Sequence, residues 1–231
     1  MKLRNMVLAL CLVGCSVNVF AADAASLNER INDARDVLRQ IMMTPDKAIP
    51  SGIARQATCI GVIPSVKKAA FIVGASYGQG VVTCRTRSGW SAPVFIRLAG
   101  GSVGFQIGGQ ATDLVLVAVN DKGFQDLLKS KFKIGVDAAA AAGPVGRDAA
   151  AATDLKLNAE LLTYSRSKGV FAGVDLNGAV VSQNTDDTNA FYGGHAGNFE
   201  HILHGNVSAP ASARPFVTSV GRYFRAAHAG Q

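Results

Sequence analysis

The stretch SGWSAPVFIRLAGGSVGFQIGGQATDLVLVAV, from Ser88 to Val119, is the part of the sequence that decides the fold. It contains the only tryptophan, Trp90, and five glycines between Gly100 and Gly109, and it closes on an apolar run rich in valine. Apolar runs rich in Val, Ile and Phe and bounded by turn-forming residues are typical of buried strands. Glycines inside such runs mark bends or close approaches of another backbone. We therefore predict that this stretch is the central hairpin of a β-rich core.

Length and composition indicate one domain. The chain has 231 residues, which is enough for a single sizeable core. It is 48% hydrophobic and 17% charged and contains 25 glycines, which argues against a disordered chain or a long helical rod. The net charge of +7 makes an anionic partner worth considering.

Several short motifs on both sides of the opening stretch occur in the order found in SYLF domains, a family also named after a eukaryotic actin regulator. The segments that carry this resemblance are Gly78-Gln79-Gly80, Gly89 to Pro93, Gly101 to Gln110, Asp113 to Val115, Gly135 to Asp137, Gly143 to Gly146, Tyr164 to Gly173 and Tyr192-Gly193. The chain resembles the family from about Ile49 to Gly193.

We expect an α+β fold: a single domain with a glycine-rich, mainly antiparallel β core, sheet-like or barrel-like, and flanking short helices. The resemblance implies lipid binding, with phosphoinositide recognition in eukaryotic members and actin binding in some. It also favours small-residue strands for the alanine run at Ala138–Ala142. The expected organisation is a leader over residues 1–21, a helical region over 22–49, the SYLF-like core over 50–193, and a linker and helix over 194–231.

The N-terminus has the pattern of an export signal. Lys2 and Arg4 precede a short apolar run that is too brief to span a bilayer. Two cleavage sites fit the sequence. One makes Cys15 the acylated first residue of a lipoprotein, and the other is ordinary cleavage before Ala22. We expect an exported protein on the periplasmic side of the envelope, anchored by lipid in the outer membrane in the first case and periplasmic or secreted in the second.

Cys59 and Cys84 are the cysteines left in the folded body after removal of the leader. An oxidising compartment favours a disulfide between two such cysteines over a metal pair. The alternative is two unpaired buried thiols.

An amphipathic helix is predicted from Ser26, which stands in capping-box spacing with Glu29. Its apolar residues, Leu27 to Ile41, recur at helical intervals, and the charges on its other face sum to zero. Helices on membrane surfaces are usually rich in Lys and Arg. We therefore favour packing on the domain over contact with lipid. The polar segment Ser182–Asn189 is predicted to be a loop.

One segment of the chain contains cations but no acidic residues. No Asp or Glu occurs between Lys47 and Thr112. Burying unpaired cations costs several kcal/mol, so they are expected at the surface. We predict a basic patch that docks on an anionic phospholipid membrane and is formed by Lys67, Lys68, Arg85, Arg87, Lys129, Lys131 and Lys133. The last three share a face if their segment is extended. The alternative is a set of cations dispersed around the body.

Other chemistry has little support in the sequence. Gly74 to Gly78 matches the G-x-S-x-G pattern that would make Ser76 a nucleophile, but strand-like residues follow instead of a helix. The histidines His195, His201 and His204 lie close in the sequence but have no cysteine nearby, so we predict no metal site and no cofactor. Nucleic acid is disfavoured because aromatic residues do not interleave with the cations. We expect a protein that is not an enzyme. Its partner is expected to be a phospholipid membrane or, as the alternative, another protein of the envelope.

Overall fold

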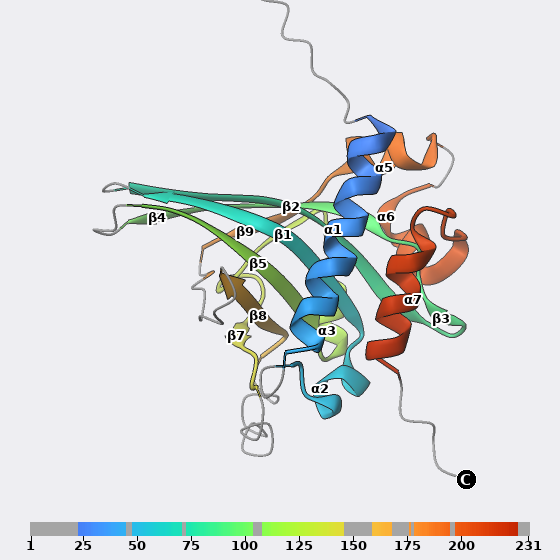
Figure 1. Cartoon of the computed structure of the whole chain (residues 1–231), viewed down its shortest axis with the longest axis horizontal. Helices are drawn as coiled ribbons and strands as arrows, with labels where there is room; N and C mark the ends of the chain where they lie inside the picture. The colour runs from blue at the N-terminus through green and yellow to red at the C-terminus, as the bar shows by residue number, and fades with distance from the viewer. Residues whose placement is uncertain are drawn as a thin grey trace, which may run out of the picture.

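The computed structural model describes residues 23–44, 48–70, 73–103, 108–145, 159–167, 176, 178–194 and 197–225. Within them, one nine-stranded sheet curls into a half-barrel with helices on both faces (Figure 1). The predicted α+β class with a mainly antiparallel β core is therefore confirmed. The leader, Cys15 and the expected processing sites lie outside the described residues.

The strands are β1 (Cys59–Ala70), β2 (Val73–Thr86), β3 (Gly89–Trp90), β4 (Val94–Val103), β5 (Gly108–Ala118), β6 (Lys131–Lys133), β7 (Ala140–Ala142), β8 (Leu161–Ser167) and β9 (Val180–Gln183). The helices are α1 (Ala24–Met42), α2 (Ser51–Gln56), α3 (Asp121–Leu128), α5 (Thr185–Tyr192), α6 (Phe199–His201), the π-helical turn η2 (Ile202–Asn206) and α7 (Arg214–Tyr223).

The strand order is β6-β9-β4-β2-β1-β5-β8-β7, and β3 pairs with the end of β2. The predicted central hairpin is wrong, because β4 and β5 are not neighbours. They flank the hairpin of β1 and β2 on opposite sides, so that β5, β1, β2 and β4 form a Greek key. The alanine run does form a strand, β7, which pairs in parallel with β8.

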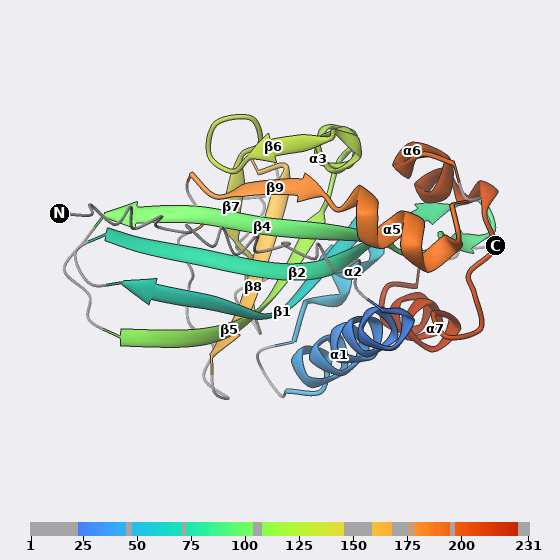
Figure 2. The same ribbon diagram turned by 90° about the horizontal axis from the view of Figure 1, so that it is seen from above.

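Each face of the sheet has its own apolar layer. The face we call the α1 face packs against α1 and α7 through residues such as Val62, Val81, Phe95 and Val115. The opposite face, the α3 face, is covered by α3, α6 and η2. The views agree that the helices gather at one end of the sheet and that the long strands β1, β2, β4 and β5 extend beyond them (Figure 2).

Helix α1 packs on the domain, as its apolar pattern predicted. Leu27, Ile31, Leu38 and Ile41 are fully buried. The helix begins earlier than the capping-box spacing suggested, because the carboxylate of Asp23 accepts a hydrogen bond from the amide of Ser26. None of the described helices is long and apolar enough to cross a membrane.

The predicted loop at Ser182–Asn189 is wrong, since most of it is helix α5. The side chain of Asn184 accepts a hydrogen bond from the amide of Asp187 and so begins the helix. Asp187 in turn forms an ion pair with Arg30 of α1, and Arg30 also lies 5.5 Å from the ring centre of Phe95. A buried ion pair with a distant helix thus accounts for a helix that local sequence did not indicate.

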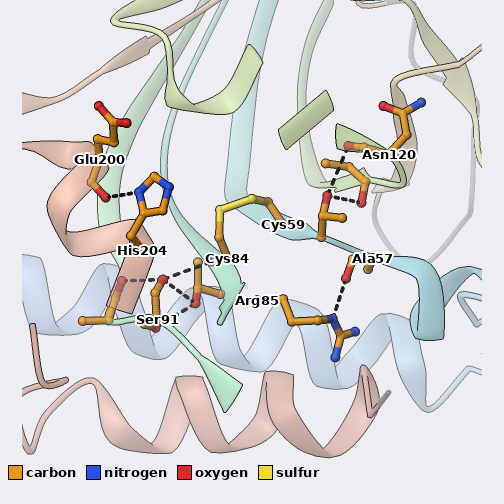
Figure 3. The surroundings of a disulfide bond; sticks show 12 residues. Ala57, Cys59, Cys84, Arg85, Ser91, Asn120, Glu200 and His204 are labelled. Carbon is orange, nitrogen blue, oxygen red and sulfur yellow. Dashed lines mark hydrogen bonds between the residues drawn. A yellow bond between two sulfur atoms is a disulfide. The ribbon is translucent and has the colours of Figure 1, made fainter. Parts of the chain in front are cut away.

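A disulfide joins Cys59 of β1 to Cys84 of β2, and both residues are fully buried (Figure 3). The two cysteines are direct cross-strand partners with their Cα atoms 4.0 Å apart. The hydroxyl of Ser91 accepts a hydrogen bond from the amide of Cys84, because this amide has no partner in β1. The disulfide therefore links two strands of the Greek key, β1 and β2, at the end of the sheet where the helices gather.

Reduction of this disulfide should lower the free energy of unfolding by about 3.5 kcal/mol, because the bond closes a long loop in the unfolded chain. The measurement is urea unfolding with and without reductant. A Cys59→Ala/Cys84→Ala variant should be as weakened as the reduced protein and should not respond to reductant. Equal stability of the wild-type protein in both conditions would contradict the bond.

Candidate functional site

Three lysines, Lys67, Lys131 and Lys133, share the α1 face of the sheet, and we call this surface the basic face. Directly paired residues of neighbouring antiparallel strands project to the same side. One such row runs across five strands, from Lys67 through Tyr77, Ala99 and Val180 to Lys133. Lys131 lies two residues from Lys133 and projects to the same side. The three lysines are exposed.

A bulge in β1 decides that Lys67 belongs to the basic face. The register of β1 shifts by one residue between Ile63 and Val66, and Ser65 adopts a positive φ of 48° there. The carboxylate of Asp113 accepts a hydrogen bond from the amide of Ser65 at 3.0 Å. One extra residue reverses the side to which every later side chain points. Lys67 therefore lies on the α1 face.

Lys68 lies on the opposite face of the sheet from Lys67. It is half-buried, and its cross-strand partner in β2 is Ser76. The two consecutive lysines thus cannot both contact one flat surface laid on the basic face.

Arg97 lies within the basic face, but its charge has partners. Its cross-strand neighbours are Gln79 and Ser182, in the row next to that of Lys67. The guanidinium donates to the side-chain oxygen of Asn184 at 2.6 Å and lies 3.8 Å from the carboxylate of Asp186. Arg97 therefore adds less positive potential than Lys67, Lys131 or Lys133.

The edge of the basic face toward α1 is electrically balanced. A cleft of about 260 Å³ lies there, and its lining includes Lys67 and Arg30 together with Glu29 and Asp33. Burial raises the pKa of Asp33, and the nearby Glu29 raises it further. The net positive charge therefore lies on the side of Lys131 and Lys133, away from the helix.

The prediction that Lys129, Lys131 and Lys133 share a face holds for two of the three. Lys131 and Lys133 are exposed around buried Phe132, as alternation in a strand requires. Lys129 instead follows the end of α3, and its ammonium lies 2.5 Å from Asp126. Its pKa is raised, chiefly by the hydrogen bond to that carboxylate. Lys129 is therefore neutralised and does not belong to the basic face.

The structure does not bring Arg85 and Arg87 to Lys67 and Lys68, so the predicted single patch of seven cations is wrong. Arg85 lies on β2 nine residues beyond Ser76, the partner of Lys68. At about 3.3 Å per residue this separation is roughly 30 Å. The two arginines lie at the disulfide end of the sheet, whereas the two lysines lie toward its other end.

Arg85 supports the fold from within. Its guanidinium donates to the carbonyl oxygen of Ala57 at 2.9 Å and to that of Phe224 at 2.8 Å (Figure 3 shows the first bond). These carbonyls end α2 and α7, where the helix dipole favours a positive charge. Arg85 also stacks over Trp90 at 4.7 Å, and burial lowers its pKa. Arg87 is exposed in the turn before β3.

The candidate catalytic residues do not form a site. Ser76 lies inside strand β2, and its hydroxyl donates to the carbonyl of Gly100 at 3.3 Å, so it does not stand on a strand-turn-helix elbow. His204 hydrogen-bonds the carbonyl of Glu200. Among the residues that the structure describes, no group of three or more His, Cys, Asp or Glu residues could hold a metal ion.

Comparisons with known proteins agree on one family. The family described as Ysc84, Las17-binding protein actin regulator, matches residues 99–223. SH3 domain-containing YSC84-like protein 1 of Rattus norvegicus is 36% identical over 171 residues, which are 73% of this chain and 50% of that protein. Protein YSC84 of Saccharomyces cerevisiae is 30% identical over 201 residues, 83% of this chain and 42% of that protein. The chain spans about half the length of the curated relatives it matches.

Replacing Arg85 by alanine should destabilise the protein by about 3 kcal/mol, because several charged hydrogen bonds to helix ends are lost. Urea unfolding followed by the fluorescence of Trp90 measures both the stability and the loss of the stacked guanidinium. Arg87→Ala is the matched control and should change stability by no more than about 0.5 kcal/mol. An Arg85→Ala variant as stable as this control would contradict the supporting role.

Proposed function

Because this chain belongs to the Ysc84 family, also called the SYLF family, we propose that it is a non-enzymatic binding protein whose basic face docks on anionic phospholipid. The observation that carries the proposal is the convergence of Lys67, Lys131 and Lys133 on one side of the sheet. Among the described residues, no carboxylate lies within ion-pair distance of these three ammonium groups. Their charge is therefore available to an external partner.

The magnitude of the attraction suits reversible docking. Each lysine near an anionic membrane contributes about 1 kcal/mol, so the three lysines contribute at most about 3 kcal/mol, or roughly a hundredfold in affinity. Lys67 contributes the smallest share, because Glu29 and Asp33 line the same cleft. Asp137 is the acidic residue nearest to Lys133 in the sequence. Its carboxylate accepts a hydrogen bond from the backbone amide of Lys133 at 2.8 Å. That bond holds the carboxylate at the turn.

Tyr77 supplies the apolar part of this contact. It is the direct cross-strand partner of Lys67 and is 49% exposed. Tyrosine side chains are enriched at the boundary between lipid and water because the ring is apolar and the hydroxyl is polar. A tyrosine beside a lysine on a broad strand surface fits the headgroup region of a bilayer better than bulk water.

The location that we propose follows from the leader. An N-terminal export signal, cleaved before Cys15 or before Ala22, would bring the domain to the periplasmic side of a bacterial envelope. In the first case Cys15 would carry the lipid anchor. The anchor would hold the basic face close to headgroups and so raise its effective concentration at the membrane.

Charge reversal tests the proposed face. A Lys67→Glu/Lys131→Glu/Lys133→Glu variant should bind vesicles containing anionic phospholipid at least about a hundredfold more weakly than wild type in a flotation assay, since three attractions become repulsions. Binding by the wild type should also fall as salt screens the charges.

The matched control is Arg55→Glu/Arg222→Glu/Arg225→Glu, which changes the net charge equally at exposed positions on and just after α2 and α7. Flotation of this control should stay close to that of the wild type. Equal loss in both triple variants would mean that only net charge matters, and wild-type flotation by the lysine variant would reject the face.

A protein partner is the second candidate, and the family description favours it. The matching family is described as Las17-binding and as an actin regulator, and its matched residues 99–223 include α5 and α7 but not Lys67. A surface formed by the helices would then carry the function, and the basic face would be incidental.

Co-sedimentation with actin filaments separates the two candidates. If lipid is the partner, neither the wild type nor the lysine variant should pellet with filaments at physiological salt, because added salt screens contact between exposed charges. Saturable pelleting of both proteins, without flotation of either, would favour the protein partner.

A further inference from the structure

The cleft between helix α1 and strands β1 and β2 has two walls of opposite charge. Its volume is about 260 Å³. Pockets for drug-sized ligands occupy about 300 to 1,000 Å³, so this cleft suits a smaller molecule, such as a single amino acid. One wall belongs to α1 and the other to the two strands.

The wall formed by α1 is acidic. Glu29 and Asp33 lie four residues apart and so share one side of the helix, where like charges repel each other. Among the described residues, no cation lies within ion-pair distance of either carboxylate. Burial raises the pKa of Asp33 and the charge of Glu29 raises it further, as expected for a carboxylate without a counter-ion. A bound cation would stabilise both carboxylates.

The wall formed by the strands carries a positive charge and an aromatic ring. Lys67 and Tyr77 are direct cross-strand partners, and Gln79 projects to the same side two residues further along β2. No described carboxylate lies within ion-pair distance of the Lys67 ammonium. The ring of Tyr77 is 49% exposed and adds an apolar surface beside it. This wall therefore offers donors for an anionic group and a surface for an apolar one.

Each wall is fixed by contacts outside the cleft. The guanidinium of Arg30, which also lines the cleft, is bound to the carboxylate of Asp187 in α5 at 2.5 Å. On the other wall, the carboxylate of Asp113 holds the amide of Ser65 in the bulge of β1. The opposite charges of the two walls therefore stay apart without an ion pair between them. A ligand that enters this space needs little rearrangement of the protein, which lowers the entropy cost of binding.

We propose that this cleft binds a free α-amino acid with an apolar side chain. The ammonium group of the amino acid binds the carboxylates of Glu29 and Asp33. Its carboxylate accepts hydrogen bonds from Lys67 and Gln79, and its side chain packs on the ring of Tyr77. The acidic wall repels a lone anion and the basic wall repels a lone cation, so a molecule with both charges fits best.

Titration of the full chain with L-leucine, followed by amide resonances, tests the proposal. The wild type should bind saturably, with changes at Asp33 and Lys67 and none at Ser88, which lies outside the lining. N-acetyl-L-leucine lacks the ammonium group and L-leucinamide lacks the carboxylate. Each should bind at least about tenfold more weakly than leucine, the loss expected for a charged hydrogen bond. If either analogue binds as tightly as leucine, the proposal is overturned.

An Asp33→Asn variant tests the acidic wall, because the substitution removes the charge and keeps the shape of the side chain. Leucine binding should weaken at least about tenfold. The matched control is Asp36→Asn on the same helix, since Asp36 lies outside the lining and its carboxylate is bound to Arg35 at 3.3 Å. This control should bind leucine like the wild type. A folded Asp33→Asn variant with wild-type affinity would contradict the assignment.

O-phosphoethanolamine distinguishes a free amino acid from the headgroup of a zwitterionic lipid. This probe also carries an ammonium group and an anionic group, but it has no apolar side chain to pack on Tyr77. Leucine should therefore bind more tightly. Tighter binding of O-phosphoethanolamine would overturn the amino acid as the ligand.

The cleft and the basic face fail independently, although both include Lys67. A Lys131→Glu/Lys133→Glu variant should lose flotation and keep leucine binding. Asp33→Asn should lose leucine binding and float at least as well as the wild type. Absence of saturable leucine binding by the wild type would overturn the cleft proposal, whatever flotation shows.

Discussion

The bulge in β1 is the constraint on which the arrangement of this domain depends. Two glycines of β2 make room for it: a side chain at Gly78 would lie 2.7 Å from Ile63, and one at Gly80 would overlap the carbonyl of Val62. Asp113 then holds the amide of Ser65 and is itself bound by Arg166 at 3.0 Å. The first half of β1 contributes side chains to the apolar layer under α1. Because the bulge adds one residue, the second half exposes Lys67 to solvent on the same face.

The cations of this region, which have no acidic neighbours in the sequence, are accommodated in three ways. Arg85 is partly buried and bound to carbonyls at the ends of α2 and α7. Arg97 is paired with Asn184 and Asp186, which belong to a distant part of the chain. Lys67 remains exposed among the strands. Of these three cations, only Lys67 has a charge that is exposed for contact with a membrane. A segment without acidic residues therefore does not by itself produce a basic surface.

Local patterns predicted the features that depend on near neighbours in the chain. The apolar spacing of α1 was confirmed, and Lys131 to Lys133 show the alternation that an extended segment requires. The strand at Ala140–Ala142 was also confirmed, but it was implied by the family resemblance and not by the local pattern. The disulfide between Cys59 and Cys84 is also present, since two cysteines leave one pairing. The prediction for Ser182–Asn189 was wrong because polar residues with a capping asparagine satisfy a loop and a short helix equally well, and contact with α1 decides between them.

The sequence by itself determined the fold class and the family, because glycine and valine patterning restricts the backbone locally and recurs in a fixed order. It also showed that the chain has positive charge in excess. Only the tertiary structure decided that β4 and β5 flank another hairpin instead of forming one, and that Lys67 joins Lys131 and Lys133 while Arg85 does not. The physical reason is that strand order and the side to which each residue points depend on pairing between distant segments, and a one-residue bulge is enough to reverse that side.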